Sequence, residues 1–181
     1  MPGTQEILKD WHEFYLLTGT AAAALVALLF VAASIGAGFL TPERAEASRV
    51  YMSPVVLHFT SVLFASLVVL IPSHAYLAPA LLIGGNGVVG VTASAFIFKR
   101  VLKHDGADWI DSIAYGAAPL VAYAAMLAAA VLLMRKSGMA GDVLAFGVVL
   151  LLIANIRNAW DLTLVMARRH SAGSNHGKQP E

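Results

Sequence analysis

Residues 50–98 read VYMSPVVLHFTSVLFASLVVLIPSHAYLAPALLIGGNGVVGVTASAFIF and contain no Asp, Glu, Lys or Arg. A helix that crosses the hydrocarbon core of a bilayer needs about 20 mostly apolar residues, so this stretch is long enough for two passes. Pro72 and Ser73 form a natural turn near its middle. The stretch therefore predicts two consecutive transmembrane helices, over residues 50–71 and 77–98.

Three more apolar stretches predict three more passes, over residues 14–40, 112–134 and 143–167. Of the 181 residues, 59% are hydrophobic and 13% are charged, whereas a soluble domain has about 25% charged residues. Small and helix-forming residues dominate, which favours helices over a lipid-facing barrel of alternating strands. The predicted fold is an all-α integral membrane protein with five transmembrane helices in a compact bundle.

The distribution of Lys and Arg predicts how the five passes are oriented. Five passes put the two termini on opposite sides of the membrane. The side that holds the C-terminus carries eight basic residues: Arg44, Arg49, Lys99, Arg100, Lys103, Arg168, Arg169 and Lys178. The other side carries three: Lys9, Arg135 and Lys136. The positive-inside rule then predicts a cytoplasmic C-terminus and an outside N-terminus. We expect a bacterial cytoplasmic membrane, a polar lead-in at residues 1–13, and a disordered cytoplasmic tail at residues 168–181.

The last predicted pass carries polar and charged side chains where they are costly. Asn155, Arg157, Asn158 and Asp161 fall within an arc of about 160° on a helix. An ionisable residue inside a spanning helix is a candidate functional site, and Arg157 and Asp161 have the spacing of a helical ion pair. Two interpretations stay open. The pair faces the protein interior as a binding or coupling site, or it reaches the headgroups beside Trp160.

His58 is the only histidine deep within a predicted span. It lies about 13 Å beyond Arg49 along its helix, at a depth similar to that of the Arg157/Asp161 pair. A histidine and an aspartate in a membrane interior can pass protons or respond to pH. The alternative is a neutral imidazole hydrogen-bonded to a neighbouring helix. The predicted binding or coupling cluster comprises Arg157, Asp161, Asn158, Asn155, His58 and Tyr115.

Small residues predict where the helices approach one another closely. The candidate packing positions are Gly84, Gly87, Gly90, Ser34 and Gly38. Ordinary bundle packing is one interpretation, and a glycine-lined translocation path through the third pass is the other.

Few chemical signatures point to a reaction. Cysteine is absent, the net charge is +1, and neither G-x-S-x-G nor H-E-x-x-H occurs. We therefore predict no nucleic-acid partner, no metal site and no catalytic residue. No cofactor is predicted either, because haem ligation at His58 would require a second buried histidine. The expected partners are the bilayer, a second copy or another membrane protein, and anionic headgroups near Lys99, Arg100 and Lys103.

Two functions follow from these features, and a third has weaker support. The first is a small protein that moves or senses a proton, an ion or a small solute through the polar cluster. The second is an accessory or scaffold subunit whose polar face docks a partner helix. An enzyme that acts on lipid or quinone is supported only by unspecific residues.

Overall fold

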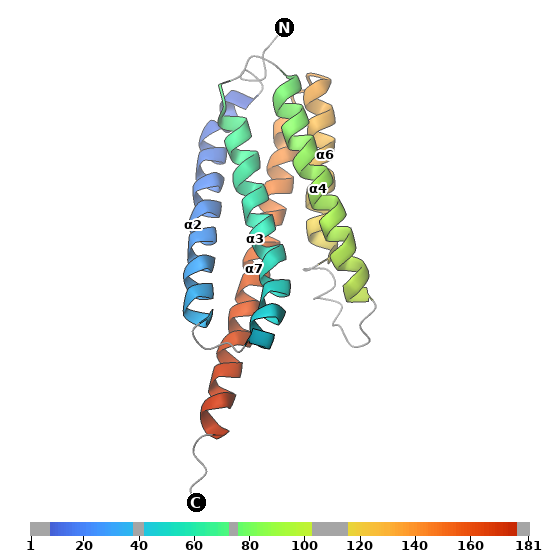
Figure 1. The fold of residues 1–181 in the computed structure, drawn as a ribbon. Helices are drawn as coiled ribbons and strands as arrows, with labels where there is room; N and C mark the ends of the chain where they lie inside the picture. The colour runs from blue at the N-terminus through green and yellow to red at the C-terminus, as the bar shows by residue number, and fades with distance from the viewer. Residues whose placement is uncertain (1–7, 38–41, 73–75, 103–115, 177–181) are drawn as a thin grey trace, which may run out of the picture.

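The structure is a computed structural model that describes residues 8–37, 42–72, 76–102 and 116–176. A short 3-10 helix, η1 (Lys9–Trp11), is followed by α2 (His12–Ala37), α3 (Pro42–Leu70), α4 (Leu77–Leu102), α6 (Ala118–Met134) and α7 (Ala140–His176). The five α-helices lie side by side, and each runs opposite to the one before it (Figure 1). The start of α2 and the end of α7 consequently lie at opposite ends of the bundle.

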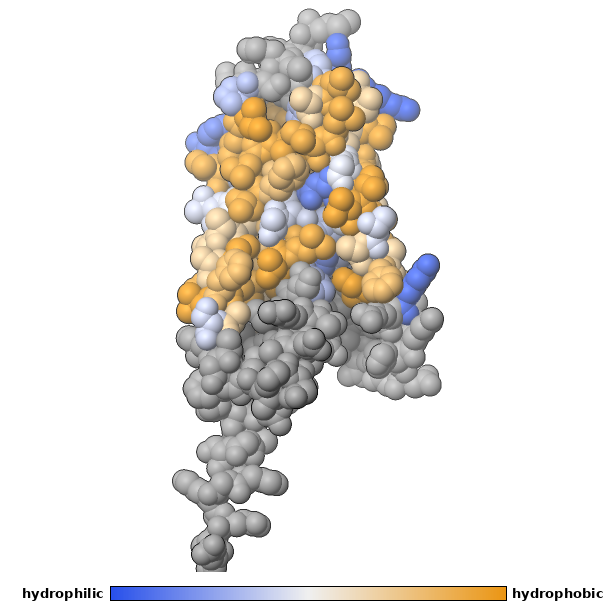
Figure 2. All heavy atoms as spheres, viewed as in Figure 1, coloured by the Kyte–Doolittle hydropathy of each residue, from blue (hydrophilic) through white to orange (hydrophobic). Residues whose placement is uncertain are grey.

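The outer surface of the bundle is strongly apolar. Figure 2 shows hydrophobic residues over most of the described surface on the viewed face. Exposed large apolar side chains include Leu17, Phe30, Leu81, Phe96 and Ile153. Three segments are long and apolar enough to cross a membrane: His12–Ser34, Leu77–Lys99 and Ala140–Asp161. The last has 22 residues, which as a helix extend for about 33 Å, close to the hydrocarbon thickness of about 30 Å. These helices indicate a membrane protein.

The prediction of an all-helical chain is confirmed over the described residues. Two segments that were predicted to be non-helical are helical in the structure. α3 begins at Pro42, so residues 42–49 form its first turns where a connecting loop was expected. Proline is well tolerated in the first turn of a helix, because its missing N–H would have no partner there. Glu43 also favours a helix start, since the helix dipole stabilises negative charge at that end.

The C-terminal segment is also more helical than the sequence suggested. α7 continues to His176, so residues 168–176 are helical where a disordered tail was expected. Extending an existing helix gains one hydrogen bond for each residue fixed, and residues 140–179 contain no proline that would interrupt α7. Residues 177–181 lie outside the described part. The same holds for residues 103–115, and α6 is described from Ala118 onward where a pass from residue 112 was expected.

α3 is the central helix of the bundle. It packs against α2, α4 and α7, while α6 packs between α4 and α7. Phe59, Val62 and Ala65 of α3 are fully buried in this interior. Toward the start of α2, the hydroxyls of Thr18 and Ser66 lie 3.2 Å apart and join α2 to α3. The interior is therefore apolar, with isolated polar contacts between helices.

Glycines allow α4 and α6 to approach closely. A methyl group built on Gly84, Gly87 or Gly90 would meet, in that order, Ala130, Leu127 and Tyr123 of α6. At Gly84 the added carbon would make an ordinary van der Waals contact, whereas at Gly90 it would overlap atoms of the Tyr123 ring. The three glycines that were predicted as packing positions thus line one seam, and Tyr123 occupies the deepest part of it.

The predicted packing role of Ser34 does not match its position. Ser34 is exposed, and its hydroxyl donates to the carbonyl of Phe30 at 2.8 Å within the same helix. A serine that satisfies its own hydroxyl in this way can face lipid. The small residue at the α2–α3 contact is instead Gly19, which lies against Ser66. Gly38 lies outside the described residues.

Replacing Gly141 with alanine is expected to loosen the contact between η1 and the start of α7. The added methyl group would overlap the Trp11 indole, and the adjacent Tyr15 hydroxyl donates to the Gly141 carbonyl at 3.3 Å. Overpacking of this kind costs about 1–3 kcal/mol. Thermal unfolding in detergent should show a lower Tm for this variant. Gly138→Ala is the control, since a methyl group there meets no atom of the described residues within 4 Å. Equal Tm values for the two variants would contradict the contact.

Candidate functional site

His58 lies on α3 in the bundle interior and is 2% exposed. Its Nδ1 atom is 2.9 Å from the hydroxyl oxygen of Tyr123 on α6. The two ring centroids are 5.6 Å apart, with an angle of 47° between the planes. The Tyr123 hydroxyl donates to the Ser61 hydroxyl at 3.0 Å. Because Ser61 follows His58 by three residues, both side chains lie on the same face of α3.

A third helix closes this group of polar side chains. Asn86 of α4 donates through Nδ2 to the backbone carbonyl of Ser61 at 3.1 Å, and the same atom is 3.7 Å from the Met126 sulfur. We call His58, Ser61, Asn86 and Tyr123 the His58–Tyr123 cluster. Figure 2 shows hydrophilic atoms inside the apolar band between α3 and α4. The cluster therefore links α3, α4 and α6 within the bundle interior.

The position of the Tyr123 ring depends on the α4–α6 seam. The ring packs on the Gly90 backbone, where any other residue would place a side-chain carbon. Tyr123 is fully buried, so its hydroxyl needs hydrogen-bond partners inside the protein. His58 and Ser61 supply them. The glycine on α4 and the polar pair on α3 thus act together to hold one tyrosine in place.

Asn155 joins α7 to α3 near this cluster. Its side chain is fully buried, and Nδ2 donates to the Val55 carbonyl at 2.7 Å. Val55 precedes His58 by three residues on α3. Asn158 is 2% exposed and therefore also inside. The two asparagines predicted on α7 are consequently interior residues.

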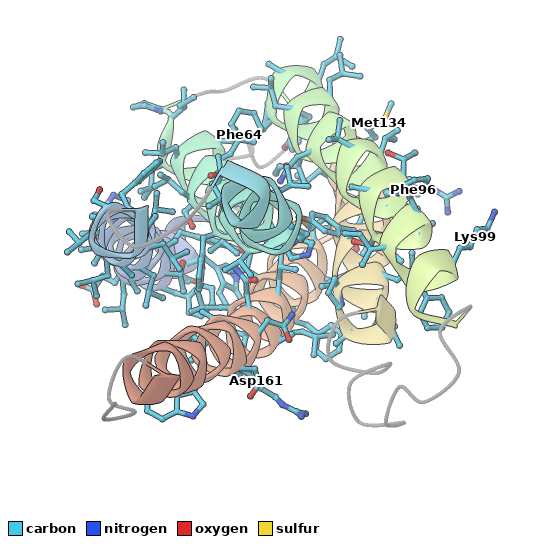
Figure 3. All side chains as sticks on the ribbon, turned by 60° about the horizontal axis from the view of Figure 1, so that its bottom comes forward. Phe64, Phe96, Lys99, Met134 and Asp161 are labelled. Atoms are coloured by element: carbon cyan, nitrogen blue, oxygen red, sulfur yellow. The ribbon has the colours of Figure 1, made fainter. Side chains whose placement is uncertain are left out.

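Arg157 and Asp161 face away from the interior, which differs from the interior interpretation of the pair. The Arg157 Nε and Asp161 Oδ2 atoms are 3.8 Å apart, and the two side chains are 45% and 37% exposed. Figure 3 shows Asp161 on the outer side of α7, pointing away from the other helices. The reason is geometric. An arc of about 160° is too wide to be buried whole, so its Asn155 edge faces α3 and its Arg157 edge faces outward.

The sequence predicted a cluster of His58, Tyr115, Arg157 and Asp161. The structure separates His58 from the Arg157/Asp161 pair. His58 contacts Tyr123, and the charge pair lies on the outer face of α7. Tyr115 lies outside the described residues. Lys99 is exposed at the end of the Leu77–Lys99 segment (Figure 3). The Arg100 side chain and Lys103 lie outside the described part, so the expected headgroup contacts of these three residues stay a prediction.

Tyr123 and Ser61 did not emerge from the sequence pattern, although two signals pointed to them. Ser61 stands one helical turn after the only deeply placed histidine, and Tyr123 is the single aromatic residue among the small and aliphatic residues of 118–134. Spacing on one helix predicts the pairing of His58 with Ser61. It does not predict which residue on another helix completes the group.

The cluster is built from neutral hydrogen-bonding groups. An imidazole, a phenol and an alcohol can each donate and accept, so the chain His58–Tyr123–Ser61 can exchange hydrogen-bond directions. Within the described segments, no group of three or more His, Cys, Asp or Glu side chains comes together to hold a metal ion.

Comparison with protein-family models, with curated proteins and with solved structures finds no match to this chain. The functional argument consequently rests on the geometry of the cluster and on the arrangement of the helices.

Leucine at Arg157 or at Asp161 is expected to change stability only slightly. Exposed ion pairs contribute about 0–1 kcal/mol, and this pair is separated by 3.8 Å with both side chains well exposed. Both single variants and the double variant should therefore keep a Tm within a few degrees of the parent protein in detergent. If both single variants failed to fold and the double variant recovered, the pair would have to be buried, and the outward placement would be wrong.

Proposed function

We propose that this chain is a five-pass protein of a bacterial cytoplasmic membrane, with its N-terminus outside and its C-terminus in the cytoplasm. Three helices have the length and composition of membrane spans, and Pro54–Leu70 and Ala118–Met134 are shorter apolar helices that run alongside them. The start of α2 and the end of α7 lie at opposite ends (Figure 1), as an odd number of passes requires. The excess of eight Lys and Arg over three supports a cytoplasmic C-terminus.

Reporter fusions test this topology in bacterial cells. Alkaline phosphatase, which is active only outside the cytoplasm, should be active when fused after Pro72 or Ser137 and inactive when fused after Glu181. Green fluorescent protein should show the opposite pattern. Alkaline phosphatase activity after Glu181 would contradict the proposed orientation. Matching activity after Pro72 and Leu102 would contradict the passage of α4 through the membrane.

We infer that the protein moves protons across this membrane through the His58–Tyr123 cluster. The observation that carries this proposal is the 2.9 Å contact between His58 Nδ1 and the Tyr123 hydroxyl, inside an apolar helical bundle. Histidine is the side chain that ordinarily gains and loses a proton near neutral pH. Ionisable residues inside membrane proteins typically mark proton or substrate pathways.

The hydrogen-bond directions in the cluster define a proton-transfer step. Tyr123 donates to Ser61, so the proton shared with His58 resides on Nδ1 and the phenol oxygen accepts it. A proton that arrives at Nε2 makes the ring a cation. The Nδ1 proton then passes to the Tyr123 oxygen, the Tyr123 proton passes to the Ser61 oxygen, and the former Ser61 proton leaves to a water molecule. The imidazole then holds its proton on Nε2, so the starting state returns only when water moves this proton back to Nδ1 and the two hydroxyls rotate.

Other buried polar groups occur on α3 on either side of the cluster. The Val55 carbonyl contacts Asn155, and the Ser66 hydroxyl contacts Thr18. From residue 55 to residue 66 the helix rises about 16 Å, roughly half the thickness of the hydrocarbon core. Polar contacts over this depth support a route along α3 that includes the cluster, and no cofactor enters the proposal.

Proton flux into liposomes tests the proposed transport. Purified protein is reconstituted in vesicles that contain a pH-sensitive dye, and an acid pulse is applied with valinomycin and potassium to balance charge. The parent protein and His12→Gln should acidify the interior faster than protein-free vesicles, because His12 is exposed at the start of α2. His58→Gln should fall to the protein-free rate. Flux in His58→Gln equal to that of the parent would refute the route through His58.

A second candidate is an accessory subunit of a membrane complex that docks a partner helix on α7. The outward position of Arg157 and Asp161 favours it. The asparagine side of the same helix already packs inside the bundle, so a docking face would be limited to the charged side and Trp160, which is 64% exposed. Parent-like proton flux in His58→Gln, together with loss of a defined complex in Arg157→Leu, would favour this candidate.

A further inference from the structure

Asn155 has one buried oxygen whose hydrogen-bonding capacity is unused. Its Nδ2 atom donates to the Val55 carbonyl, but Oδ1 is buried and has no hydrogen-bond partner among the described residues. Leaving such a group unpaired costs about 1–3 kcal/mol. Buried polar atoms in native proteins are nearly always paired with the protein or with an ordered water molecule. A ligand that donates a hydrogen bond to Asn155 Oδ1 would remove this cost.

The Asn155 amide reaches α3 at the level of the His58 ring. Val55, whose carbonyl it contacts, lies one turn before His58, about 4.5 Å along the helix axis. Side chains on a helix tilt toward its N-terminus, so the His58 side chain extends over the turn that contains Val55. The Asn155 amide therefore contacts the same turn of α3 over which the His58 side chain extends.

His58 offers a second acceptor at this place. Because its Nδ1 carries the proton shared with Tyr123, the other ring nitrogen, Nε2, has a free lone pair in the neutral ring. The described hydrogen bond of His58 engages Nδ1 and not Nε2. Asn155 Oδ1 and His58 Nε2 are thus two hydrogen-bond acceptors on helices that pack against each other, α7 and α3.

We propose that an internal water molecule binds between α3 and α7 and donates one hydrogen to Asn155 Oδ1 and the other to His58 Nε2. Water supplies two donors for two acceptors, and buried waters typically make about three hydrogen bonds. A metal cation fits less well, because the described segments bring no cluster of carboxylates or histidines together to balance its charge. The site takes a neutral donor, and water is the smallest one available.

The role of this water in proton transfer rests on the proposed function, whereas its presence does not. In the proton route, the water delivers a proton to His58 Nε2 from the α7 side and receives another from the solvent. Asn155 is a positioning residue in this step, since it holds the water but does not exchange a proton itself.

Water-edited solid-state NMR tests the site directly. Protein labelled with ¹⁵N-histidine is reconstituted in bilayers, and the His58 signals are assigned from their loss in His58→Gln. Magnetisation transferred from water protons should reach His58 Nε2 within milliseconds in the parent protein. In Asn155→Leu, which matches the size of asparagine without its oxygen, this transfer should fall several-fold. Ser94→Ala is the control, because it removes a different buried hydroxyl, on α4, that has no hydrogen-bond partner among the described residues.

The outcomes separate the water site from the proposed transport. Absence of water transfer to Nε2 in the parent protein would overturn the site, even if Asn155→Leu failed to fold. Unchanged transfer in a folded Asn155→Leu would overturn the role of Asn155. Water transfer in a protein that shows no proton flux would leave the site in place and refute transport. Proton flux in a protein that shows no water transfer to Nε2 would support transport and overturn the water site.

Discussion

Gly90→Ala is expected to lower the free energy of unfolding by about 3 kcal/mol, near the upper end for overpacked cores. The added carbon would overlap atoms of the Tyr123 ring, which is fully buried. A shift of the ring away from α4 would strain its hydrogen bonds to His58 and Ser61. The substitution should therefore disrupt both the packing of α4 on α6 and the hydrogen bonds of the His58–Tyr123 cluster.

The measurement is thermal unfolding in detergent. It is monitored as the amount of monodisperse protein that remains after heating to each temperature. For a chain of this size, about 1 kcal/mol corresponds to 2–4 °C in Tm, so a drop of roughly 6–12 °C is expected. Gly85→Ala is the matched control on the same helix, since a methyl group there meets no atom of the described residues within 4 Å. A Gly90→Ala protein as stable as Gly85→Ala would show that Tyr123 does not pack on Gly90.

Tyr123→Phe is expected to lower stability by about 1–2 kcal/mol and to abolish proton flux. The phenol oxygen joins His58 to Ser61, and phenylalanine leaves both partners without it. Hydrogen bonds between membrane helices contribute about 0.6 kcal/mol on average, whereas an unpaired buried polar group costs about 1–3 kcal/mol. We weight the second effect more heavily, because the ring shape is retained and His58 stays buried.

Tyr76→Phe provides the control for Tyr123→Phe. The Tyr76 hydroxyl is buried without a hydrogen-bond partner in the described part of the chain, while its ring lies 5.0 Å from the Lys136 ammonium group. Phenylalanine keeps the ring and removes the unpaired hydroxyl, so stability should stay equal or rise slightly. Equal losses of Tm in the two variants would mean that the His58–Tyr123 hydrogen bond contributes nothing.

Much of the fold follows from where charges are missing along the chain. The uncharged residues 50–98 with their central turn predict the start of α4 at Leu77, which is where it begins. Charge patterns are weaker guides to helix ends. Residues 42–49 and 168–176 are helical although they carry charges, because each residue added to an existing helix gains a backbone hydrogen bond.

The candidate site was only partly predictable. His58 and Asn155 are recognisable as polar residues inside apolar segments, and both are buried. Their partners depend on the register between helices, which periodicity on one helix does not define. The glycine seam sets that register, since it brings Tyr123 of α6 onto Gly90 of α4. Arg157 stands out by its charge, but it lies on the outer face in the last turns of the Ala140–Asp161 segment, where a long basic side chain can extend toward the headgroups.

The most direct test of the account is proton flux into liposomes that contain the parent protein, the Arg157→Leu/Asp161→Leu double variant, or His58→Gln. A route through the His58–Tyr123 cluster predicts equal flux for the parent and the double variant, and only the protein-free rate for His58→Gln. A parent protein no faster than protein-free vesicles, or a double variant that loses flux while His58→Gln keeps it, would contradict the account.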